Sequence, residues 1–294
     1  MVTDRIIIIN NGPMSMEITT KPYYVKEIKG IDGLESTIVT SQGFNQSGAT
    51  IVNTITEPRI IEISGQINAD STQQMQYMRS KLISLFPHIR ELTLYHYYGG
   101  SGRKISAMVE KGPTFEPDNV STIESYSVRL KAGNPYWEDI EEVKYSVANW
   151  IPKLHFPLIV PVGEKIVFGV KNASYIVNVQ NNSSMEIPMK IVFKANGALY
   201  GPQLFNIDTR EFIKINCSMD YGDRLTVDTK KDKPKVTYES GGSTKSYIDK
   251  IDLVGGGHTF LKLKPGENLL RYSAEEGENS LELEIYVNNK YEGV

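Results

Sequence analysis

Histidine and cysteine, the usual ligands of zinc, are scarce in this chain. The four histidines are His88, His96, His155 and His258, and no two of them stand at an i, i+4 spacing or in a Cys/His frame. Because the ligands of a zinc ion must converge on one point, this spacing gives no support for a zinc site. The single cysteine, Cys217, alternates with polar residues in FIKINCSMD, which predicts a small buried side chain rather than a reactive thiol.

Carboxylate pairs are a second set that could do chemistry, since two acids can hydrolyse a glycosidic bond. Asp220 and Asp223 flank a turn in MDYGDRL, and Asp249 and Asp252 lie close together in YIDKIDL. Turn formation by aspartate and solvent-facing strand positions explain both pairs without catalysis. We therefore interpret the two pairs as structural.

Sequence motifs for phosphate or acyl chemistry are also missing. The chain contains no GxSxG elbow, no GxxxxGK[ST] phosphate loop and no GxGxxG motif after a strand pattern. The glycine-rich stretch VGGGHTF at 254–260 precedes a strand pattern rather than a helix, so we expect a hairpin loop there. The sequence predicts no enzymatic activity, no cofactor and no metal.

Aromatic side chains offer binding chemistry instead, because exposed rings stack on sugars or anchor protein interfaces. They are densest in LTLYHYYGG at 92–100. On a strand, Tyr95 and Tyr97 face one way while Leu94 and His96 face the other. Both faces therefore need cover, either by a partner subunit or by a second layer of the same domain.

The stretch KAGNPYWED at 131–139 raises a similar choice, between a sugar-stacking site and the end of a folding unit. It follows the alternating strand pattern YSVRL, which Gly133 and Pro135 bring to an end. We interpret the stretch as a hinge rather than a pocket. Pro135, Tyr136 and Trp137 are the candidate residues for packing between domains.

Alternation of apolar and polar residues dominates the rest of the chain and predicts strands. Examples are RIIEISGQI at 59–67, RKISAMVE at 103–110 and SLELEIYVN at 280–288. The exception is 70–86, where Asp70 or Ser71 is suited to cap a helix and Pro87 to end it. The apolar stripe of this helix consists of Met75, Met78, Leu82 and Leu85.

These patterns predict a mainly β fold in three parts. Residues 1–137 form an N-terminal β domain with one long α-helix, and residues 163–294 form an all-β domain. Between them, residues 138–162 form a connector that contains Pro152, Pro157 and Pro161. Prolines at this density prevent continuous strand pairing and favour an extended segment.

Composition and charge exclude several classes of function. The chain of 294 residues is 40% hydrophobic and 23% charged, with a net charge of −3. Broad binding to nucleic acid or to anionic membranes leaves a basic footprint, which is missing here. No apolar run approaches the ~20 residues that span a bilayer. We expect a protein that is made in a cytoplasm and stays there or is released by lysis.

Four further stretches, taken in order, carry a family resemblance. They are GNPYWED at 133–139, GDRLTVDT at 222–229, FLKLKPGENLLRY at 260–272 and the terminal YEGV at 291–294. Together with the β-plus-helix first half, they resemble the distal tail proteins of long-tailed phages and of phage-tail-like particles of Gram-positive bacteria. The resemblance covers nearly the whole chain, and it is the order of the stretches that makes it specific.

The resemblance implies a ring-forming, tail-tube-like N-terminal domain in a hexameric homo-oligomer, followed by a galectin-like β-sandwich. It implies a structural protein of the virion tail tip or baseplate that is assembled in the cytoplasm of the host bacterium. The implied partners are the tail tube protein, the tail-tip hub or tail-associated lysin, and receptor-binding or baseplate proteins. DNA would pass through the ring without specific binding, and no membrane would be contacted.

The segment 39–67 is the candidate for contact between subunits of such a ring. Its glycine-punctuated polar stretches precede the strong strand pattern at 59–67 and suit a long hairpin that reaches beyond its own domain. An ordinary mobile loop is the alternative. The candidate contact residues are Phe44, Ile51, Val52, Ile55 and Arg59.

A carbohydrate-binding β-sandwich module that contacts the host surface is the alternative function, and a glycoside hydrolase ranks third. A galectin pocket needs His, Asn and Arg on one strand, with a Trp beneath the sugar. Here Trp137 and Trp150 precede the predicted sandwich, and His258 lies in the glycine-rich loop. We therefore expect the second domain not to recognise the host surface itself.

Overall fold

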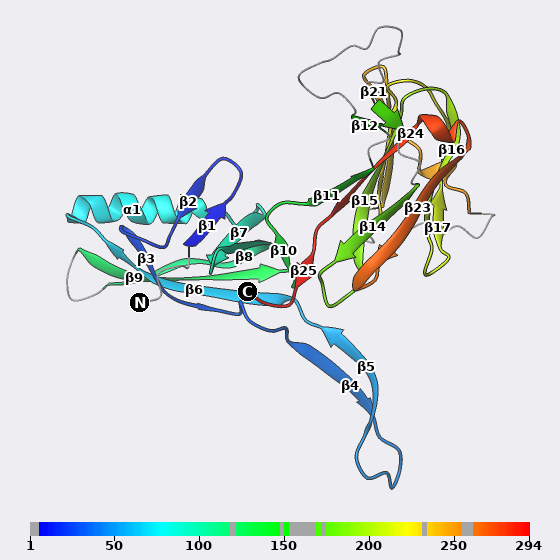
Figure 1. Ribbon diagram of the computed structural model, residues 1–294. Helices are drawn as coiled ribbons and strands as arrows, with labels where there is room; N and C mark the ends of the chain where they lie inside the picture. The colour runs from blue at the N-terminus through cyan, green and yellow to red at the C-terminus, as the bar shows by residue number, and fades with distance from the viewer. Residues whose placement is uncertain are drawn as a thin grey trace. The chain divides into compact units, whose positions relative to one another are not determined.

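The computed structural model describes residues 6–117, 122–147, 150–152, 169–171, 175–230, 234–253 and 261–294. The chain divides into two compact units (Figure 1). The first unit comprises Met1–Ile140 together with Lys290–Val294, and the second comprises Glu141–Asn289. In sequence terms, the second unit is therefore inserted into the first.

The first unit is built on an antiparallel sheet. Its strands are β1 (Ile6–Asn10), β2 (Ser15–Glu17), β3 (Tyr23–Lys29), β6 (Arg59–Asn68), β7 (Leu92–Tyr98), β8 (Ser101–Pro117), β9 (Ile123–Ala132), β10 (Trp137–Asp139) and β25 (Lys290–Tyr291). They follow the order β2-β1-β7-β8-β9-β6-β3, with β10 beside β8 and β25 beside β10. The long strand β8 pairs with β7 through its first half and with β9 through its second half, so it links the two parts of the sheet.

Strands β6 and β9 show why the period-two pattern produces this sheet. Ile61 lies opposite Leu130 and Ile63 opposite Val128, and all four side chains are buried. Between these pairs, polar residues of the same strands point to the other face. The strand predicted at 59–67 is confirmed, because its alternating isoleucines supply one buried face.

Helix α1 (Thr72–Leu85) begins and ends close to where the sequence predicts. The side chain of Ser71 accepts a hydrogen bond from the backbone N–H of Gln74 at 3.2 Å, which is the expected N-cap contact. The side-chain amide of Asn11 donates to the last carbonyls of the helix. The buried side chains are those of the predicted stripe, Met75, Met78, Leu82 and Leu85.

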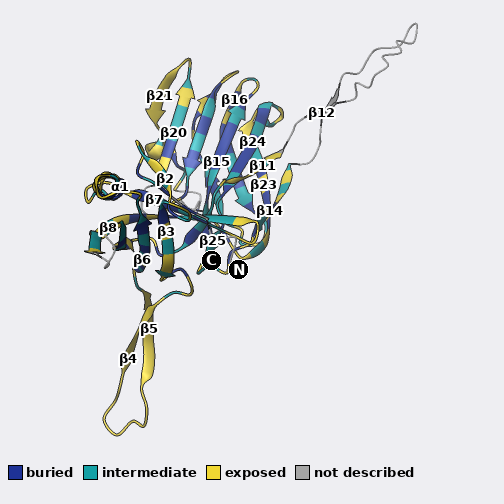
Figure 2. Ribbon diagram, turned by 90° about the vertical axis from the view of Figure 1, so that its left-hand side faces the viewer, coloured by how far each residue is buried: buried dark blue, intermediate teal, exposed yellow. Residues whose placement is uncertain are grey.

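A hairpin formed by β4 (Ser36–Ser41) and β5 (Thr50–Thr56) extends from the first unit, away from the main sheet (Figure 1). Every residue of both strands is exposed, and the hairpin is yellow throughout in Figure 2. The segment 39–67 was predicted to suit a long hairpin; the hairpin is present, but its strands are β4 and β5, and 59–67 belongs to β6 of the main sheet.

The second unit is a sandwich of two antiparallel sheets. Its strands are β11 (Val143–Val147), β14 (Ile176–Asn181), β15 (Ile187–Ala195), β16 (Leu199–Asn206), β17 (Phe212–Lys214), β18 (Ser218–Met219), β19 (Arg224–Asp228), β20 (Lys235–Ser240), β21 (Ser243–Ser246), β22 (Lys262–Leu263), β23 (Gly266–Glu276) and β24 (Leu281–Val287). One sheet runs β11-β24-β15-β19-β20-β21, with β22 beside β15. The other runs β14-β23-β16-β17, with β18 beside β16.

Side chains from both sheets of the second unit form one buried core. Phe193 and Ile285 come from the first sheet, and Leu204 and Tyr272 come from the second. Each is buried because every second residue of its strand faces the opposite sheet. The predicted mainly β fold, with one long helix in its first half and a β-sandwich in its second, is confirmed.

The division into units differs from the expected linear order of 1–137, 138–162 and 163–294. The segment expected as a connector contains β11, which pairs with β24 inside the second unit, because Val143 and Tyr145 continue the period-two pattern. It also contains β12 (Trp150–Pro152), which pairs with β13 (Gly169–Lys171). Pro157, Pro161 and the glycine-rich stretch 254–260, where a hairpin loop was predicted, lie outside the described residues.

Among the described residues, no helix combines the length and the apolar character needed to cross a membrane.

Candidate intersubunit interface and the clamp at its root

The hairpin β4–β5 presents apolar side chains to solvent. Phe44 at its tip is 99% exposed and Ile51 is 64% exposed. The other large apolar side chains exposed on the hairpin are Ile38, Val39, Val52 and Ile55. A two-stranded ribbon is only marginally stable in water by itself, and clustered exposed apolar groups mark interaction sites. The structure thus brings Phe44, Ile51, Val52 and Ile55 together on one element.

The pairing of the hairpin distributes these side chains over both of its faces. Thr40 lies opposite Ile51 and Thr37 opposite Ile55, with a register shift after Val39. Because side chains alternate along a strand and paired residues share a face, Ile38 and Ile51 lie on one face. Val39 and Ile55 lie on the other. A surface that covers the hairpin must therefore contact it from two sides.

The hairpin also lacks the usual protection of exposed strand edges. No charged residue occurs from Ser36 to Thr56, and Glu35 and Glu57 flank this stretch. Soluble proteins normally place charges or prolines on such edges to prevent pairing with other chains. The uncharged composition is typical of a strand pair that another chain covers.

Hydrogen bonds hold the tip of the hairpin in a defined turn. The Oε1 atom of Gln46 accepts from the backbone N–H of Gly43 at 2.9 Å, and its Nε2 donates to the hydroxyl of Thr50 at 3.0 Å. The side chain of Gln42 donates to the carbonyl of Gln46 at 3.1 Å. Phe44 is therefore presented outward by an ordered loop, as an aromatic anchor for a protein interface would be.

The fifth candidate contact residue, Arg59, lies inside the first unit and is only 5% exposed. Its Nε donates to the carbonyl of Pro135 at 2.6 Å, and its Nη1 donates to the carbonyls of Gly30 at 2.6 Å and Asp32 at 2.8 Å. Its Nη2 donates to the carbonyl of Glu292. The expected contact of Arg59 with another subunit is corrected accordingly, because its donors are taken up within its own unit.

Arg59 instead forms a clamp at the root of the hairpin. It is the first residue of β6, three residues after the end of β5, and Gly30 and Asp32 lead into β4. Burial lowers the pKa of its guanidinium, but an arginine remains charged in proteins. A buried charge that is held by backbone carbonyls makes each of those carbonyls important to the fold. The sequence offered no signal for this role, because the partners are backbone atoms far apart in the chain.

The hinge residues Pro135, Tyr136 and Trp137 make contacts within the first unit. Trp137 is fully buried in its core, with its ring centre 6.1 Å from that of His96, and it pairs with Tyr291 across β10 and β25. Tyr136 is half-buried and Pro135 is buried. The burial of Trp137 leaves no face of its ring for a sugar, and the role of the three residues in packing between domains stays a prediction.

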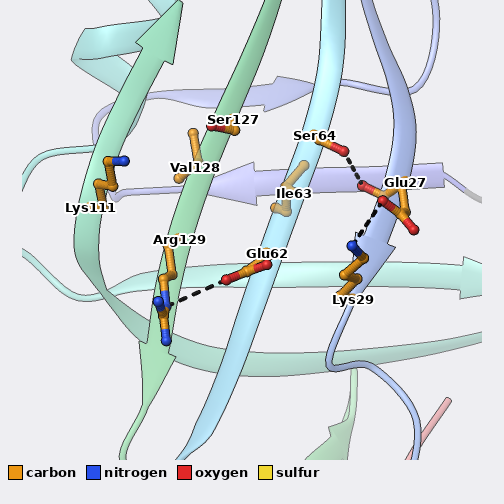
Figure 3. Close-up of a pocket in the computed structure, with 9 residues that line it drawn as sticks. All are labelled: Glu27, Lys29, Glu62, Ile63, Ser64, Lys111, Ser127, Val128 and Arg129. Carbon is orange, nitrogen blue, oxygen red and sulfur yellow. Dashed lines mark hydrogen bonds and ion pairs between the residues drawn. The ribbon is translucent and has the colours of Figure 1, made fainter.

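A shallow depression of about 360 Å³ lies on the polar face of strands β3, β6, β9 and β8 (Figure 3). Acids and bases alternate across it. Glu62 lies 3.6 Å from Arg129, and Glu27 lies 3.4 Å from Lys29. Because each of these acids already has a basic partner, the arrangement is that of an ion-paired surface rather than of a catalytic carboxylate pair.

The acid pairs and the cysteine have structural roles in the second unit. The side chain of Asp223 accepts from the backbone N–H of Asp220 at 2.8 Å and so closes their turn. Asp252 pairs with Lys214 at 3.6 Å, and Asp249 pairs with the adjacent lysine. Burial raises the pKa of the Cys217 thiol to about 11. Within the described ranges, no group of three His, Cys, Asp or Glu side chains is placed to hold a metal ion.

Comparison with known proteins agrees with this architecture. The family described as phage tail protein RIFT-related domain matches residues 15–132, and the siphovirus-type tail component, C-terminal domain, matches residues 182–291. The first match lies in the first unit, and the second match lies within the second unit apart from its last two residues. No curated protein sequence is significantly similar to the chain.

Solved structures of phage proteins share the fold over nearly the whole chain. The Dit protein of phage SPP1, described as a paradigm of the hub adsorption apparatus in phages that infect Gram-positive hosts, matches with a TM-score of 0.70 and 12% identity. That match covers 98% of this chain and 99% of the SPP1 protein. Chains of the phage p2 baseplate in its activated conformation, with Ca and with Sr, match with TM-scores of 0.60 and 11% identity, over 99% of both chains.

Two tail-protein domains in this order, one for each unit, together with the fold of the SPP1 Dit protein along the chain, lead to one assignment. The chain belongs to the siphovirus distal tail protein family and is a structural protein of the phage tail or baseplate.

Proposed function

We propose that this tail protein forms a hexameric ring through its first unit, in which the hairpin β4–β5 of each copy is covered by a neighbouring copy. The ring joins the tail tube to the tail-tip hub and its tail-associated lysin. The second unit, as a galectin-like sandwich, offers a surface to which receptor-binding or baseplate proteins attach. DNA passes through the ring without specific binding, and the role is structural rather than enzymatic.

The observation that carries this proposal is the uncharged hairpin with apolar side chains on both faces. A ring of identical copies in head-to-tail contact gives every hairpin the same cover and leaves none exposed. The membership in a tail-protein family and the tail-tip and baseplate proteins that share the fold support the same role.

Sedimentation and native mass measurement test the ring. The wild-type chain is expected to assemble toward six times its mass of 33.0 kDa as its concentration rises. Ile51→Lys and Ile55→Lys each place a charge on a different face of the hairpin, so each is expected to shift the population toward monomers. Deletion of residues 42–54 is expected to do the same.

Ile89→Lys is the matched control, because Ile89 is also exposed, at 74%, in the first unit but outside the hairpin. This control is expected to assemble as the wild type does. A soluble hexamer that survives both hairpin substitutions and the deletion unchanged would rule out the hairpin as the contact. A wild-type chain that stays monomeric even on purified tail tubes would rule out the ring.

A further inference from the structure

The last five residues of the chain are bound in a cradle on the first unit. Trp137 of β10 pairs with Tyr291 of β25, and the guanidinium of Arg103 stacks on the ring of Tyr291 at 3.8 Å. Arg103 also donates to the carbonyl of Gly293. The segment is therefore held as an added strand, with arginine donors on its backbone carbonyls, which is how extended peptides are commonly bound.

The other side of this cradle is the root of the hairpin. The backbone N–H of Val294 donates to the carbonyl of Ile31 at 3.1 Å. Gly293 lies so close to Asp32 that a Cβ atom at this glycine would stand 2.9 Å from the carbonyl carbon of Asp32. The last residues thus contact the turn that leads into β4.

Arg59 joins the two sides. Its Nη1 holds the carbonyls of Gly30 and Asp32 in that turn, while its Nη2 holds the carbonyl of Glu292. If the last residues leave, Nη2 of this buried arginine loses its acceptor, and water must enter to replace it. Loss of this hydrogen bond therefore destabilises Arg59, the same side chain that fixes the hairpin root.

We propose that the first unit contains a binding site for an extended peptide, that its ligand is the chain's own segment Lys290–Val294, and that occupancy of this site fixes the root of the hairpin. A chain that lacks this segment therefore presents a loose hairpin. If the hairpin is the ring contact, as proposed above, such chains are excluded from rings. The effect of the bound segment on the hairpin root does not depend on the ring proposal. The exclusion of such chains from rings does depend on it.

Hydrogen exchange on three variants of the chain tests whether the bound segment fixes the hairpin root. Gly293→Ala adds the Cβ atom that the Asp32 backbone leaves no room for, and a second variant ends at Asn289. In both, the amides of residues 30–35, Glu57 and Arg59 are expected to exchange at least about tenfold faster, while amides of α1 keep their wild-type rates. Glu292→Gln is the matched control, since it keeps the backbone carbonyl that Arg59 binds, and it is expected to exchange like the wild type.

A synthetic peptide with the sequence of residues 288–294, NNKYEGV, provides the test for binding. Added to the chain that ends at Asn289, it is expected to restore slow exchange at residues 30–35, Glu57 and Arg59, whereas the same peptide with alanine in place of its glycine is expected not to. If the truncated chain fails to fold, Gly293→Ala decides alone. Unchanged exchange at the root in Gly293→Ala would overturn the proposal.

Sedimentation of the same variants distinguishes a failure of this proposal from a failure of the ring proposal. A loosened root with unchanged hexamers would mean that the site exists but does not control assembly. A wild-type chain without hexamers would contradict the ring and leave the exchange result valid. Co-expression of tagged truncated chains with wild-type chains is expected to yield rings that lack the tag.

Discussion

Lys194 donates a hydrogen bond to the Oε1 atom of Glu284 at 2.6 Å, between neighbouring central strands of a sheet in the second unit. The same oxygen accepts from Lys144 at 2.7 Å, and the hydroxyl of Tyr286 donates to the other oxygen at 3.0 Å. Burial alone would raise the pKa of Glu284, but these hydrogen bonds outweigh it and hold the pKa at about 2, against 4.5 for a free glutamate.

This lowered pKa predicts a pH-dependent contribution to stability. Because the folded pKa lies below the unfolded one, the contribution is complete above pH 4.5 and is lost as the pH falls toward 2. Glu284→Gln is expected to lower the free energy of unfolding of the second unit by about 1–3 kcal/mol at pH 7. The difference from the wild type is expected to shrink steadily between pH 4.5 and pH 2.

Denaturant titrations at pH 7 and pH 3 measure this difference. Glu239→Gln is the control, since Glu239 is an exposed residue of β20 in the same sheet. Its effect is expected to be small at both pH values. An equal effect of Glu284→Gln at both pH values would contradict the assigned hydrogen bonds.

The clamp predicts that Arg59 cannot be replaced by another cation. A lysine keeps the charge but lacks the planar fork that reaches separate carbonyls, so Arg59→Lys is expected to cost about 2–4 kcal/mol. Calorimetry that resolves the unfolding transition of the first unit measures this cost. Arg79→Lys is the comparison, because Arg79 has a half-exposed side chain and pairs with Glu124, and it is expected to cost less than about 1 kcal/mol. Equal costs would argue against the clamp.

Two glycines at the hairpin root are predicted to differ sharply. Gly30 has a φ of +78°, and a Cβ atom there would stand 1.9 Å from the carbonyl oxygen of Ile60. Gly33 has open space around the position of its Cβ. Gly30→Ala is expected to cost about 2 kcal/mol or more, whereas Gly33→Ala is expected to be nearly neutral. Thermal unfolding of the two variants side by side makes the comparison, and similar melting temperatures would contradict it.

Cys217 is predicted to be inert in the folded protein. Its buried thiol has a pKa of about 11, so little thiolate forms at pH 8. Alkylation at pH 8 is expected to be slow in buffer and fast in denaturant. In Phe44→Cys, by contrast, the introduced thiol at the exposed tip is expected to react in the folded chain at least about a hundredfold faster than Cys217. Peptide mapping of the label distinguishes the two positions.

Local pattern was enough to predict much of this fold from the sequence. The helical spacing of Met75 and Met78 and the alternating isoleucines of β6 each decide their own burial, because periodicity acts over a few residues. The hairpin was predictable for the same reason, since its glycines and polar residues are local signals.

Long-range pairing was not predictable from such signals. The clamp joins Arg59 to backbone carbonyls of Gly30 and Glu292. Every residue has a backbone carbonyl, so the sequence does not indicate which ones accept from the arginine. The return of β25 to β10 depends on two short strands that are stable only when they lie beside the rest of the sheet. Strand β11 was not predicted, because the prolines that follow it along the chain favoured an extended connector.

The insertion of the second unit into the first has a mechanical consequence. A force on the second unit reaches the first through two chain crossings, at residues 140–141 and 289–290. Because β10 and β25 are antiparallel neighbours, both crossings leave the same end of that strand pair. A pull along the strands therefore moves β10 and β25 together and loads the pairing of β10 with β8 in shear, where Glu138 lies opposite Lys104 and Asp139 opposite Arg103. Trp137 anchors β10 through its burial in the core, and Tyr291 anchors β25 through its contact with Arg103. The force is therefore shared by two strands that are each held by their own contacts.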